Sequence, residues 1–586
     1  MRPGNRAASR GWVALALALL LATGLRAVNL GGRTLWYDEA FSVRFAEKGL
    51  SAMLEGTVSH GGDAAEEHPL LYYAGLYVWM RLVGQSPEMV RAFSLLAGVA
   101  TVAVIGRLAA DLFGRRAGLV AALMAAAAPF PIQYAQETRM YALMALWLAL
   151  ATWCSVRGLT SLPSPLVDGE GKPAHDGDPS PRMVLGRSGK RIFKAPINIF
   201  KVSRRGKACL APTASPISRL DSTLSAPEPR MERGHRGEAG WWAGFAVFAA
   251  LSMYTQQLSG FYLIALAVFP LLLRRRDALL RVALAGVGAL LLYAPWLLQL
   301  PGQIGKLRSA FWLPRPTLAQ AMQTVFALTA PLLDLPPGIV VGALLASLLL
   351  IAFLALHGLR ARRRAGWRLG LAAWLAFAPP VMTFVAGQVL PVYLLRALLP
   401  CALIFYVAAA WLFTRSGMPR PVAGALAALW IGFGGAGLLH HYAWDTFPNA
   451  PFDRAAAHLA AQLQPGDVIV HSNKATLLPM TYYNRALPQT FVADPPGARQ
   501  DTLAPATQRV LGVEESACVA AAASGAARVW FVIFQREIAE AGNAGDTSLG
   551  WMLAHYTPAG ATAFNDLDVY LFVAPDAEAR AAECAP

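Results

Sequence analysis

The chain alternates between long apolar runs and short polar segments that are rich in arginine. A helix needs about 20 mostly apolar residues to cross about 30 Å of hydrocarbon, so we looked for runs near that length. We predict a polytopic α-helical membrane protein with about eleven transmembrane helices. The predicted spans are residues 11–30, 89–106, 117–132, 139–157, 240–255, 258–273, 279–298, 337–357, 368–389, 396–413 and 421–440.

Arginine clusters between the runs predict which side of the membrane each loop occupies, because cytoplasmic loops carry an excess of Lys and Arg. The clusters before the first run place the N-terminus in the cytoplasm, and alternation then puts the other clusters there too. An odd number of spans places the chain after residue 440 outside. Residues 11–25 could instead be a cleaved signal peptide, but no A-x-A site follows them. The arginines used are Arg2, Arg6, Arg10, Arg107, Arg115, Arg116, Arg274, Arg275, Arg276, Arg360, Arg362, Arg363, Arg364, Arg415 and Arg420.

The segment His68–Gly84 is apolar but too short for a span, and it carries a charge at Arg81. Counting it as a crossing would move the next arginine cluster outside. We predict an amphipathic helix at the outer interface, within an outer loop of residues 31–88. Its aromatic side chains suit the headgroup level, where a ring can be half wet. They are Tyr72, Tyr73, Tyr77 and Trp79.

Two segments depart from the membrane pattern. Residues 160–238 are rich in Pro, Gly and basic residues and keep neither a helical nor a strand period, so we expect a disordered cytoplasmic insertion. Beyond residue 440, a helical segment at 453–463 leads to PGDVIVHS, a turn followed by a short apolar strand, and further strand-like runs lie at 529–534 and 568–573. We therefore expect a transmembrane domain over 1–440 and an extracytoplasmic soluble α/β domain over 441–586.

Composition excludes two classes of protein. Of 586 residues, 56% are apolar and only 15% are charged, whereas a soluble enzyme has roughly a quarter of its residues charged. The net charge of +16 lies in short clusters between spans rather than on one polar face, so we expect no nucleic-acid partner. The five cysteines show no zinc-binding spacing. Cys518 and Cys584, both in the outer domain, could form a disulfide, because that compartment permits one.

Acidic residues beside span ends are the first candidates for chemistry, since a carboxylate near a bilayer is costly unless it is wet, paired or functional. Asp38 and Glu39 follow the first span, and Glu137 and Arg139 precede the fourth. Alternation places both pairs on the outer face. Structural roles stay open for each: Asp38 or Glu39 could cap an interfacial helix, and Glu137 with Arg139 could form an ion pair at the rim.

Several strings resemble the GT-C class of membrane glycosyltransferases, in the branch of the protein O-mannosyltransferases and bacterial lipid A aminoarabinose transferases. They are LWYDEAFS, HPLLYY, QYAQETRMYAL, YAPWL near 293–297 and YLLRALLP at the tenth span. The resemblance covers the span layout and most of residues 10–440. HPLL stands where many relatives have HPP.

This resemblance implies an inverting transfer of one sugar from a polyprenyl-phosphate carrier to an acceptor hydroxyl on the outer side. A glycosidase needs two carboxylates because its alcohol leaving group must be protonated. A phosphate leaving group needs no acid, so one general base suffices, and we expect it to be Asp38, with Glu39 and Glu137 as the other candidate catalytic carboxylates. Positive charge must stabilise the departing phosphate, and Arg396, Arg139 and His68 are the candidates.

Other residues have weaker claims. Tyr141, Lys306 and Arg308 are possible substrate contacts, and the last two could be ordinary interfacial anchors. Arg396 could merely snorkel to the interface, and His68 could cap a helix. The resemblance implies no catalytic metal and no cofactor beyond the lipid-linked donor. A cluster near His68 could hold an adventitious cation or be solvated loop; it also contains Asp63, Glu66 and Glu67.

The expected setting is the inner or plasma membrane of a bacterial-type cell. The expected partners are membrane lipid, a polyprenyl-phosphate sugar donor and a glycan, lipid or protein acceptor. A polytopic transporter or lipid flippase without glycosyl transfer is the alternative. Such folds usually show internal repeats and charged or broken helices at mid-membrane, whereas here the charged residues lie at the outer ends of spans and no repeat is evident.

Overall fold

The structure is a computed structural model that describes residues 3–57, 68–162, 230–302, 313–494, 503–541, 548–575 and 584. One compact unit comprises Met1–Leu159 and Ala239–Pro586, and Thr160–Glu238 forms a second. Most of the predicted disordered insertion lies outside the described residues. The boundary at residue 440 between two predicted domains stays a prediction.

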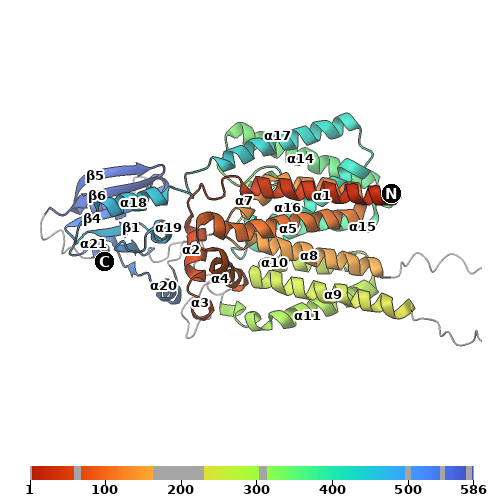
Figure 1. Ribbon diagram of the computed structural model, residues 1–586, viewed down its shortest axis with the longest axis horizontal. Coiled ribbons are helices and arrows are strands. Elements are labelled where there is room, and N and C mark those ends of the chain that lie inside the picture. The colour runs from red at the N-terminus through yellow and green to blue at the C-terminus, as the bar shows by residue number, and fades with distance from the viewer. Residues whose placement is uncertain are drawn as a thin grey trace, which may run out of the picture. The chain divides into compact units, whose positions relative to one another are not determined.

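Each predicted span coincides with a helix or, for the third, with two helices, and Figure 1 shows these helices bundled side by side. Seven helices of the described chain are long and apolar enough to cross a membrane, or eight if the bent pair α6–α7 forms one span. The apolar parts of α1 and α10 are shorter, so eleven crossings are supported in part. The helices are α1 (Pro3–Ala27), α5 (Pro87–Phe113), α6 (Arg115–Ala127), α7 (Pro129–Ala135), α8 (Tyr141–Ser161), α9 (Arg230–Thr255), α10 (Ser259–Leu272), α11 (Arg276–Leu297), α14 (Pro337–Arg360), α15 (Arg362–Gly387), α16 (Leu399–Arg415) and α17 (Arg420–Tyr442).

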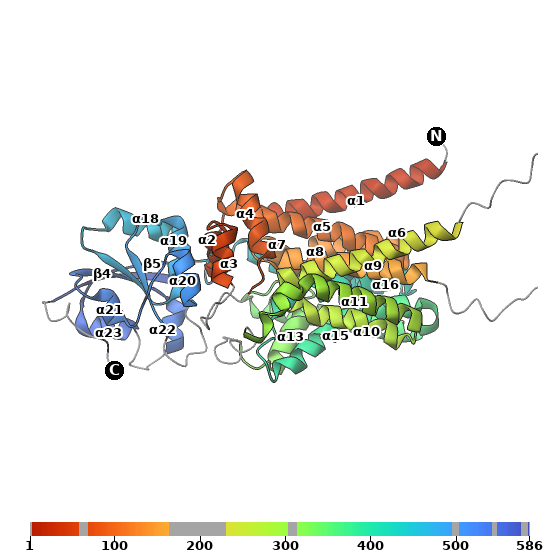
Figure 2. The same ribbon diagram turned by 90° about the horizontal axis from the view of Figure 1, so that it is seen from below.

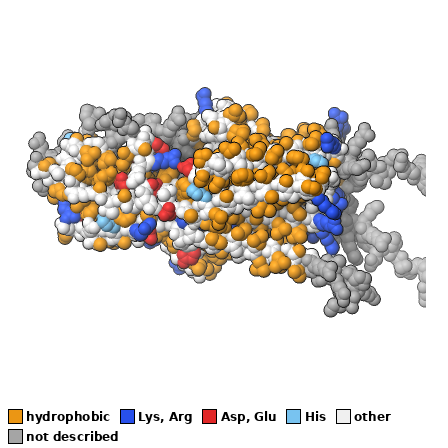
Figure 3. Space-filling model, turned by 90° about the horizontal axis from the view of Figure 1, so that it is seen from above, with side chains coloured by type: hydrophobic (Ala, Val, Ile, Leu, Met, Phe, Trp, Pro, Cys, Tyr) orange, Lys and Arg blue, Asp and Glu red, His pale blue; other side chains and the backbone are white. Residues whose placement is uncertain are grey.

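The surface of these helices is that of an integral membrane protein. Leu17 and Leu291 are 61% and 70% exposed, and Figure 3 shows hydrophobic side chains covering the flanks of the bundle. A soluble protein rarely exposes so large an apolar surface. Lys and Arg side chains gather at one end of the helices in the same view. Exposed arginines from the predicted cytoplasmic clusters are Arg107, Arg115, Arg116, Arg274, Arg276, Arg360, Arg415 and Arg420.

A break between α6 and α7 bends the third predicted span by 58°. Pro129 starts α7 and has no N–H to donate to the preceding turn, so carbonyls at the end of α6 lose their helical partners. Arg26 of α1 replaces them: its guanidinium donates to the Ala125 and Ala126 carbonyls at 3.0 and 2.9 Å. This buried arginine thereby holds α1 against the end of α6, close to the loop that follows α7.

Short helices lie at that same end, and Figure 2 shows α2, α3 and α4 beside the ends of α5 and α7. The predicted interfacial helix is α4, which has 13 residues and is not long enough to span. The expectation that its tyrosines lie at headgroup level is wrong for Tyr72 and Tyr73, because both are fully buried against the protein. The short helices are α2 (Tyr37–Ala46), α3 (Leu50–Thr57), α4 (Leu71–Val83), α13 (Leu318–Phe326) and the 3₁₀ helix η1 (Leu395–Leu398).

After α17 the chain forms the expected α/β domain around a six-stranded sheet of order β3-β2-β1-β4-β6-β5. Strands β1 to β4 are parallel, and β6 and β5 add antiparallel at one edge; the register aligns Val470 with Phe531 and Phe531 with Tyr570. The strands are β1 (Val468–His471), β2 (Gln489–Val492), β3 (Glu515–Ser516), β4 (Arg528–Phe534), β5 (Thr557–Phe564) and β6 (Leu567–Val573). The helices are α18 (Phe452–Gln462), α19 (Lys474–Tyr483), α20 (Pro505–Leu511), α21 (Val519–Ala523), α22 (Gln535–Ala541) and α23 (Ser548–His555).

Alternate side chains of the central strands build two cores, one on each face of the sheet. Ile469, Trp530 and Val532 pack with α18 on one face, and Val470 and Phe531 belong to the core on the other. This alternation follows from the two-residue period of a strand.

A disulfide joins Cys518 to Cys584, as the sequence analysis proposed. Cys518 is also the N-cap residue of α21, so the bond ties the last part of the chain to the start of that helix.

Candidate functional site

Helix α2 carries Asp38 and Glu39 in its first turn. Trp36, the residue before α2, has an extended backbone. Its carbonyl accepts hydrogen bonds from the backbone N–H groups of Glu39 and Ala40, and these bonds start the helix. Carboxylates are favoured at this end because of the positive helix N-terminus. Successive residues on a helix point in different directions, so the two carboxylates enter different environments.

Asp38 lies between two arginines that are far away in the sequence. Its Oδ2 accepts from Arg396 Nη1 at 2.8 Å and lies 3.6 Å from Arg139 Nε. Burial alone would raise the pKa of this carboxyl, but Arg139, Arg396 and the nearby His68 outweigh it and hold the pKa below its usual value. Asp38 is therefore ionised at neutral pH, as a general base must be.

Glu39 is held differently, since Arg91 of α5 grips both of its oxygens at 2.8 and 2.7 Å. Glu39 Oε1 also accepts from the backbone N–H of Thr138 at 2.8 Å, and the residue has no exposed surface. Such a carboxylate ties α2 to α5 and to the loop before α8. Its oxygens are engaged, so of the two neighbouring carboxylates Asp38 is the better placed to take a proton.

Glu137 lies in the loop between α7 and α8 and does not pair with Arg139, whose guanidinium is directed toward Asp38. Burial, together with Glu39 and Asp38, raises the pKa of Glu137 to about 8. Its Oε2 is buried and accepts no hydrogen bond within the described part of the chain. The carboxyl group is thus largely protonated at neutral pH and can donate a hydrogen bond.

A polar cavity of about 140 Å³ adjoins Glu137. Some buried polar atoms of its lining residues lack a hydrogen-bond partner among the described residues, and they include Arg33 Nε, Glu137 Oε2 and His441 Nδ1. Buried polar groups in native proteins are nearly always paired, so the cavity suits a polar ligand. The rest of the wall includes Trp36, Gln133, Asn449 and Arg396.

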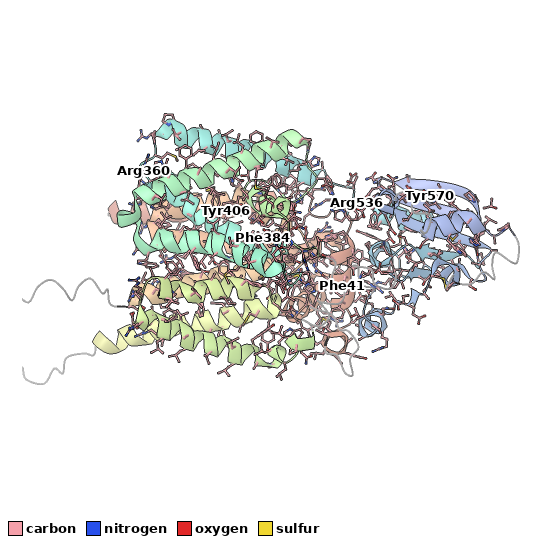
Figure 4. All side chains as sticks on the ribbon, turned by 180° about the vertical axis from the view of Figure 1, so that it is seen from behind. Phe41, Arg360, Phe384, Tyr406, Arg536 and Tyr570 are labelled. Carbon is pink, nitrogen blue, oxygen red and sulfur yellow. A yellow bond between two sulfur atoms is a disulfide. The ribbon has the colours of Figure 1, made fainter. Side chains whose placement is uncertain are left out.

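An apolar cavity of about 260 Å³ lies beside the other residues of η1. Leu395 and Leu398, which flank Arg396, line it together with residues of α13, α15 and α16. One lining residue is Phe384, which in Figure 4 lies nearer to Phe41 of α2 than to Arg360 at the opposite end of the bundle. Arg396 therefore stands where an apolar and a polar cavity approach each other, with its guanidinium bound to Asp38.

The structure brings seven of the predicted site residues together, including Glu39, which lines the polar cavity. Asp38, Arg139 and Arg396 form one cluster, with His68 close to Asp38. The Tyr141 ring lies 5.2 Å from the Arg396 guanidinium carbon. Glu137 lines the adjoining cavity. Lys306 and Arg308 lie outside the described residues.

Sequence reasoning missed Arg91, Arg33 and His441. Arg91 was detectable in principle, because it stands at the predicted outer end of a span. Arginine accumulates on the cytoplasmic side, so an arginine at an outer end is unexpected. Arg396 stands out for the same reason. Neither Arg33, in a loop, nor His441, near the end of α17, carries such a signal.

No group of three or more His, Cys, Asp or Glu side chains within the described ranges could hold a metal ion. Asp63, Glu66 and Glu67, the candidates for an adventitious cation, lie outside those ranges. The absence of a catalytic metal stays a prediction.

Comparisons with known proteins bear on the fold of the chain and on its family resemblance. Residues 67–163, which include His68, Arg91, Glu137, Arg139 and Tyr141, match the family described as dolichyl-phosphate-mannose-protein mannosyltransferase. No curated protein sequence matches the chain.

Two crystal structures of ArnT from Cupriavidus metallidurans have the same fold over nearly the whole chain. The apo structure has a TM-score of 0.57 at 13% identity and covers 98% of this chain and 99% of that one. The structure bound to undecaprenyl phosphate has a TM-score of 0.56 at 14% identity and covers 96% and 98%. The crystal structure of an oligosaccharyltransferase from Archaeoglobus fulgidus, in complex with Zn and sulfate, has a TM-score of 0.49 at 12% identity and covers 95% of this chain and 72% of that one.

These likenesses confirm the predicted fold class and resemblance. The chain is an integral membrane protein with a GT-C-like fold, and it resembles the branch that contains the protein O-mannosyltransferases and ArnT.

Proposed function

We propose that this protein transfers a monosaccharide from a polyprenyl-phosphate carrier to an acceptor hydroxyl at the outer face of the membrane, with inversion at the anomeric carbon. The observation that carries the proposal is the position of Arg396 between the two cavities. A lipid-linked donor has an apolar chain, a phosphate and a sugar in that order. The apolar cavity, the guanidinium and the polar cavity follow the same order.

Charge around Asp38 and the polar cavity supports an anionic ligand. Burial lowers the pKa of Arg33 only to about 10, so this guanidinium stays charged. Even with all three carboxylates ionised, the four guanidinium groups leave one positive charge in excess, which a phosphodiester would neutralise. The groups counted are Arg33, Arg91, Arg139, Arg396, Asp38, Glu39 and Glu137.

A single displacement accounts for the arrangement. The acceptor hydroxyl attacks the anomeric carbon, its proton passes to the Asp38 carboxylate, and the C–O bond to the phosphate breaks. The departing polyprenyl phosphate keeps the electron pair and needs no proton. Arg396 stabilises the negative charge that grows on it, which is worth most in a site that excludes water.

The polar cavity is suited to the sugar ring. Trp36 offers an aromatic face, and Arg33, Glu137 and His441 offer unpaired polar atoms to sugar hydroxyls. The likeness to ArnT bound to undecaprenyl phosphate supports a polyprenyl phosphate as the carrier. The acceptor is a protein, glycan or lipid of the cell envelope.

Orientation is part of the proposal: the N-terminus in the cytoplasm and the α/β domain outside. The exposed arginines at one end of the bundle and the Cys518–Cys584 disulfide both support it, because disulfides persist mainly outside the cytoplasm.

The test is turnover by purified protein. Protein in lipid nanodiscs is incubated with a panel of polyprenyl-phosphate sugars, including mannose and aminoarabinose, and with envelope extract as acceptor. Release of polyprenyl phosphate, matched by label in an acceptor fraction, supports the proposal when Asp38→Asn abolishes both. Movement of intact donor across the bilayer without cleavage would refute it and indicate a flippase.

A further inference from the structure

The α/β domain contacts the two short helices that carry and follow Asp38. Helix α19 packs on α2, and α20 packs on α3. Around these contacts, Arg485 pairs with Glu47 at 2.6 Å and Arg44 donates to the Leu511 carbonyl at 3.3 Å. The helix that carries the proposed base is therefore packed against the α/β domain.

One peptide group in the short segment that precedes Asp38 is held at both of its polar ends. The carbonyl of Thr34 accepts from Arg91 Nη2 at 2.9 Å, and the N–H of the next residue, Leu35, donates to the Tyr483 hydroxyl at 2.9 Å. Arg91 belongs to α5 of the bundle, whereas Tyr483 ends α19 of the α/β domain. Because the peptide group is planar, the two contacts together fix its orientation.

Neighbouring contacts extend the same arrangement. Arg91 also donates hydrogen bonds to the carbonyls of Leu30 and Arg33, each at 2.8 Å. On the other side, the Thr34 hydroxyl donates to the Ala450 carbonyl at 2.5 Å. Residues 30–35 are thus bonded to the bundle and to the α/β domain at once.

We infer that the α/β domain positions the proposed base, and that Tyr483 is a positioning residue for Asp38. This inference rests on the proposed function. Leu35 is fully buried, so removing the Tyr483 hydroxyl leaves the Leu35 N–H without the partner that holds it. The peptide can then rotate, and Trp36 and Asp38, which follow directly, move with it. Small displacements of reacting groups cost rate far more than they cost binding.

The test compares two adjacent tyrosines. Tyr483→Phe removes the hydroxyl that holds Leu35 and keeps the ring. Tyr482→Phe is the matched control, because its hydroxyl donates to the Gln85 carbonyl, outside the segment. We expect Tyr483→Phe to lower kcat about tenfold with donor KM within about twofold of wild type, and Tyr482→Phe to change neither.

A second effect separates positioning from a general loss of structure. Asp38 is kept acidic by Arg139, Arg396 and His68, whereas Glu137, Glu39 and the Tyr141 and Tyr134 hydroxyls are the other titratable groups near the cluster. If Asp38 moves away from the arginines, the acid limb of the pH–kcat profile shifts to higher pH. Hydrogen exchange of peptides covering residues 33–40 also becomes faster, and this measurement does not depend on turnover.

Thr34→Val provides a second variant, since it removes the bond to Ala450 from the same segment. It should act in the same direction as Tyr483→Phe. The inference is overturned if Tyr483→Phe matches Tyr482→Phe in kcat and acid limb, or if exchange is faster while kcat is unchanged. It is also overturned if kcat falls while exchange over residues 33–40 stays that of wild type. A wild-type protein without turnover refutes the proposed function, and the exchange experiment still decides whether Tyr483 holds this segment.

Discussion

Replacing Asp38 by Asn tests the proposed chemistry most directly. Asn has nearly the same shape and can still accept a hydrogen bond from Arg396, but it cannot take the acceptor proton. General-base catalysis is worth roughly 10²–10⁴-fold, so we expect turnover to fall at least about 100-fold.

Donor binding should change in the opposite direction. Asp38 neutralises part of the charge of Arg396, to which it is bonded at 2.8 Å. Removing a unit charge about 7 Å from a phosphodiester is worth roughly 2 kcal/mol at an effective dielectric constant near 20. The Asp38 side chain is 13% exposed, so solvent screens part of this effect. A gain of about 1 kcal/mol would tighten the donor Kd about fivefold.

Two measurements separate these effects. Single-turnover release of polyprenyl phosphate from labelled donor reports the chemical step, and equilibrium binding of the same donor in nanodiscs reports Kd. Size-exclusion behaviour and thermal inactivation confirm that the variant is folded. A folded Asp38→Asn protein that retains more than about a tenth of wild-type turnover would refute the assignment, and Glu39→Gln would be tested next.

Four further predictions follow from the site. Arg396→Ala should weaken donor binding as well as slow transfer, and an unchanged donor Kd would exclude Arg396 from the phosphate site. Glu137→Gln should stay within about threefold of wild type at pH 6.5, because amide and protonated carboxyl both donate, and it should remove a fall in activity near pH 8. Because folding raises the pKa of Glu137, the contribution of this group to stability is full below about pH 4.5 and is lost as the pH rises through about 8. The wild type should therefore lose more thermal stability between these two pH values than the Glu137→Gln variant does. Arg91→Gln should cost about 3–5 kcal/mol, seen as low yield and a lower inactivation temperature, because it leaves the Glu39 carboxylate buried without its partner. A C-terminal reporter should be active only outside the cytoplasm, and cytoplasmic activity would overturn the topology.

The membrane fold was predictable from sequence because its signal is local. Each span needs a long apolar run, and the arginine clusters order the loops, so helices such as α14 and α16 coincide with the predicted ranges. In the α/β domain, β1, β4 and β6 were found because they are short apolar runs. Strands β2, β3 and β5 were not, because β2 begins with the polar residues Gln489 and Thr490, β3 has two residues and β5 is mostly exposed.

The candidate site was predictable only where a charged side chain stands beside a membrane span. Asp38 and Glu137 were predicted because a carboxylate beside a span is costly, and Arg396 because a departing phosphate needs positive charge. Which carboxylate pairs with which arginine depends on tertiary packing. Asp38 pairs with Arg396, 358 residues away, whereas the adjacent Glu39 pairs with Arg91, 52 residues away. The role of Tyr483 could not be seen in sequence, since nothing local relates it to Leu35.

The arginine that caps the break between α6 and α7 has a consequence for biogenesis. Arg26 sits in the last turn of α1, and its acceptors are carbonyls that the ribosome adds about 100 residues later. Until then the guanidinium lacks these acceptors and, near the end of a span, has to reach toward the headgroup level for polar partners. The first helix therefore depends on the third for its final depth. Nascent chains stopped before residue 115 should leave α1 poorly anchored and open to membrane proteases, whereas chains extended past residue 135 should not.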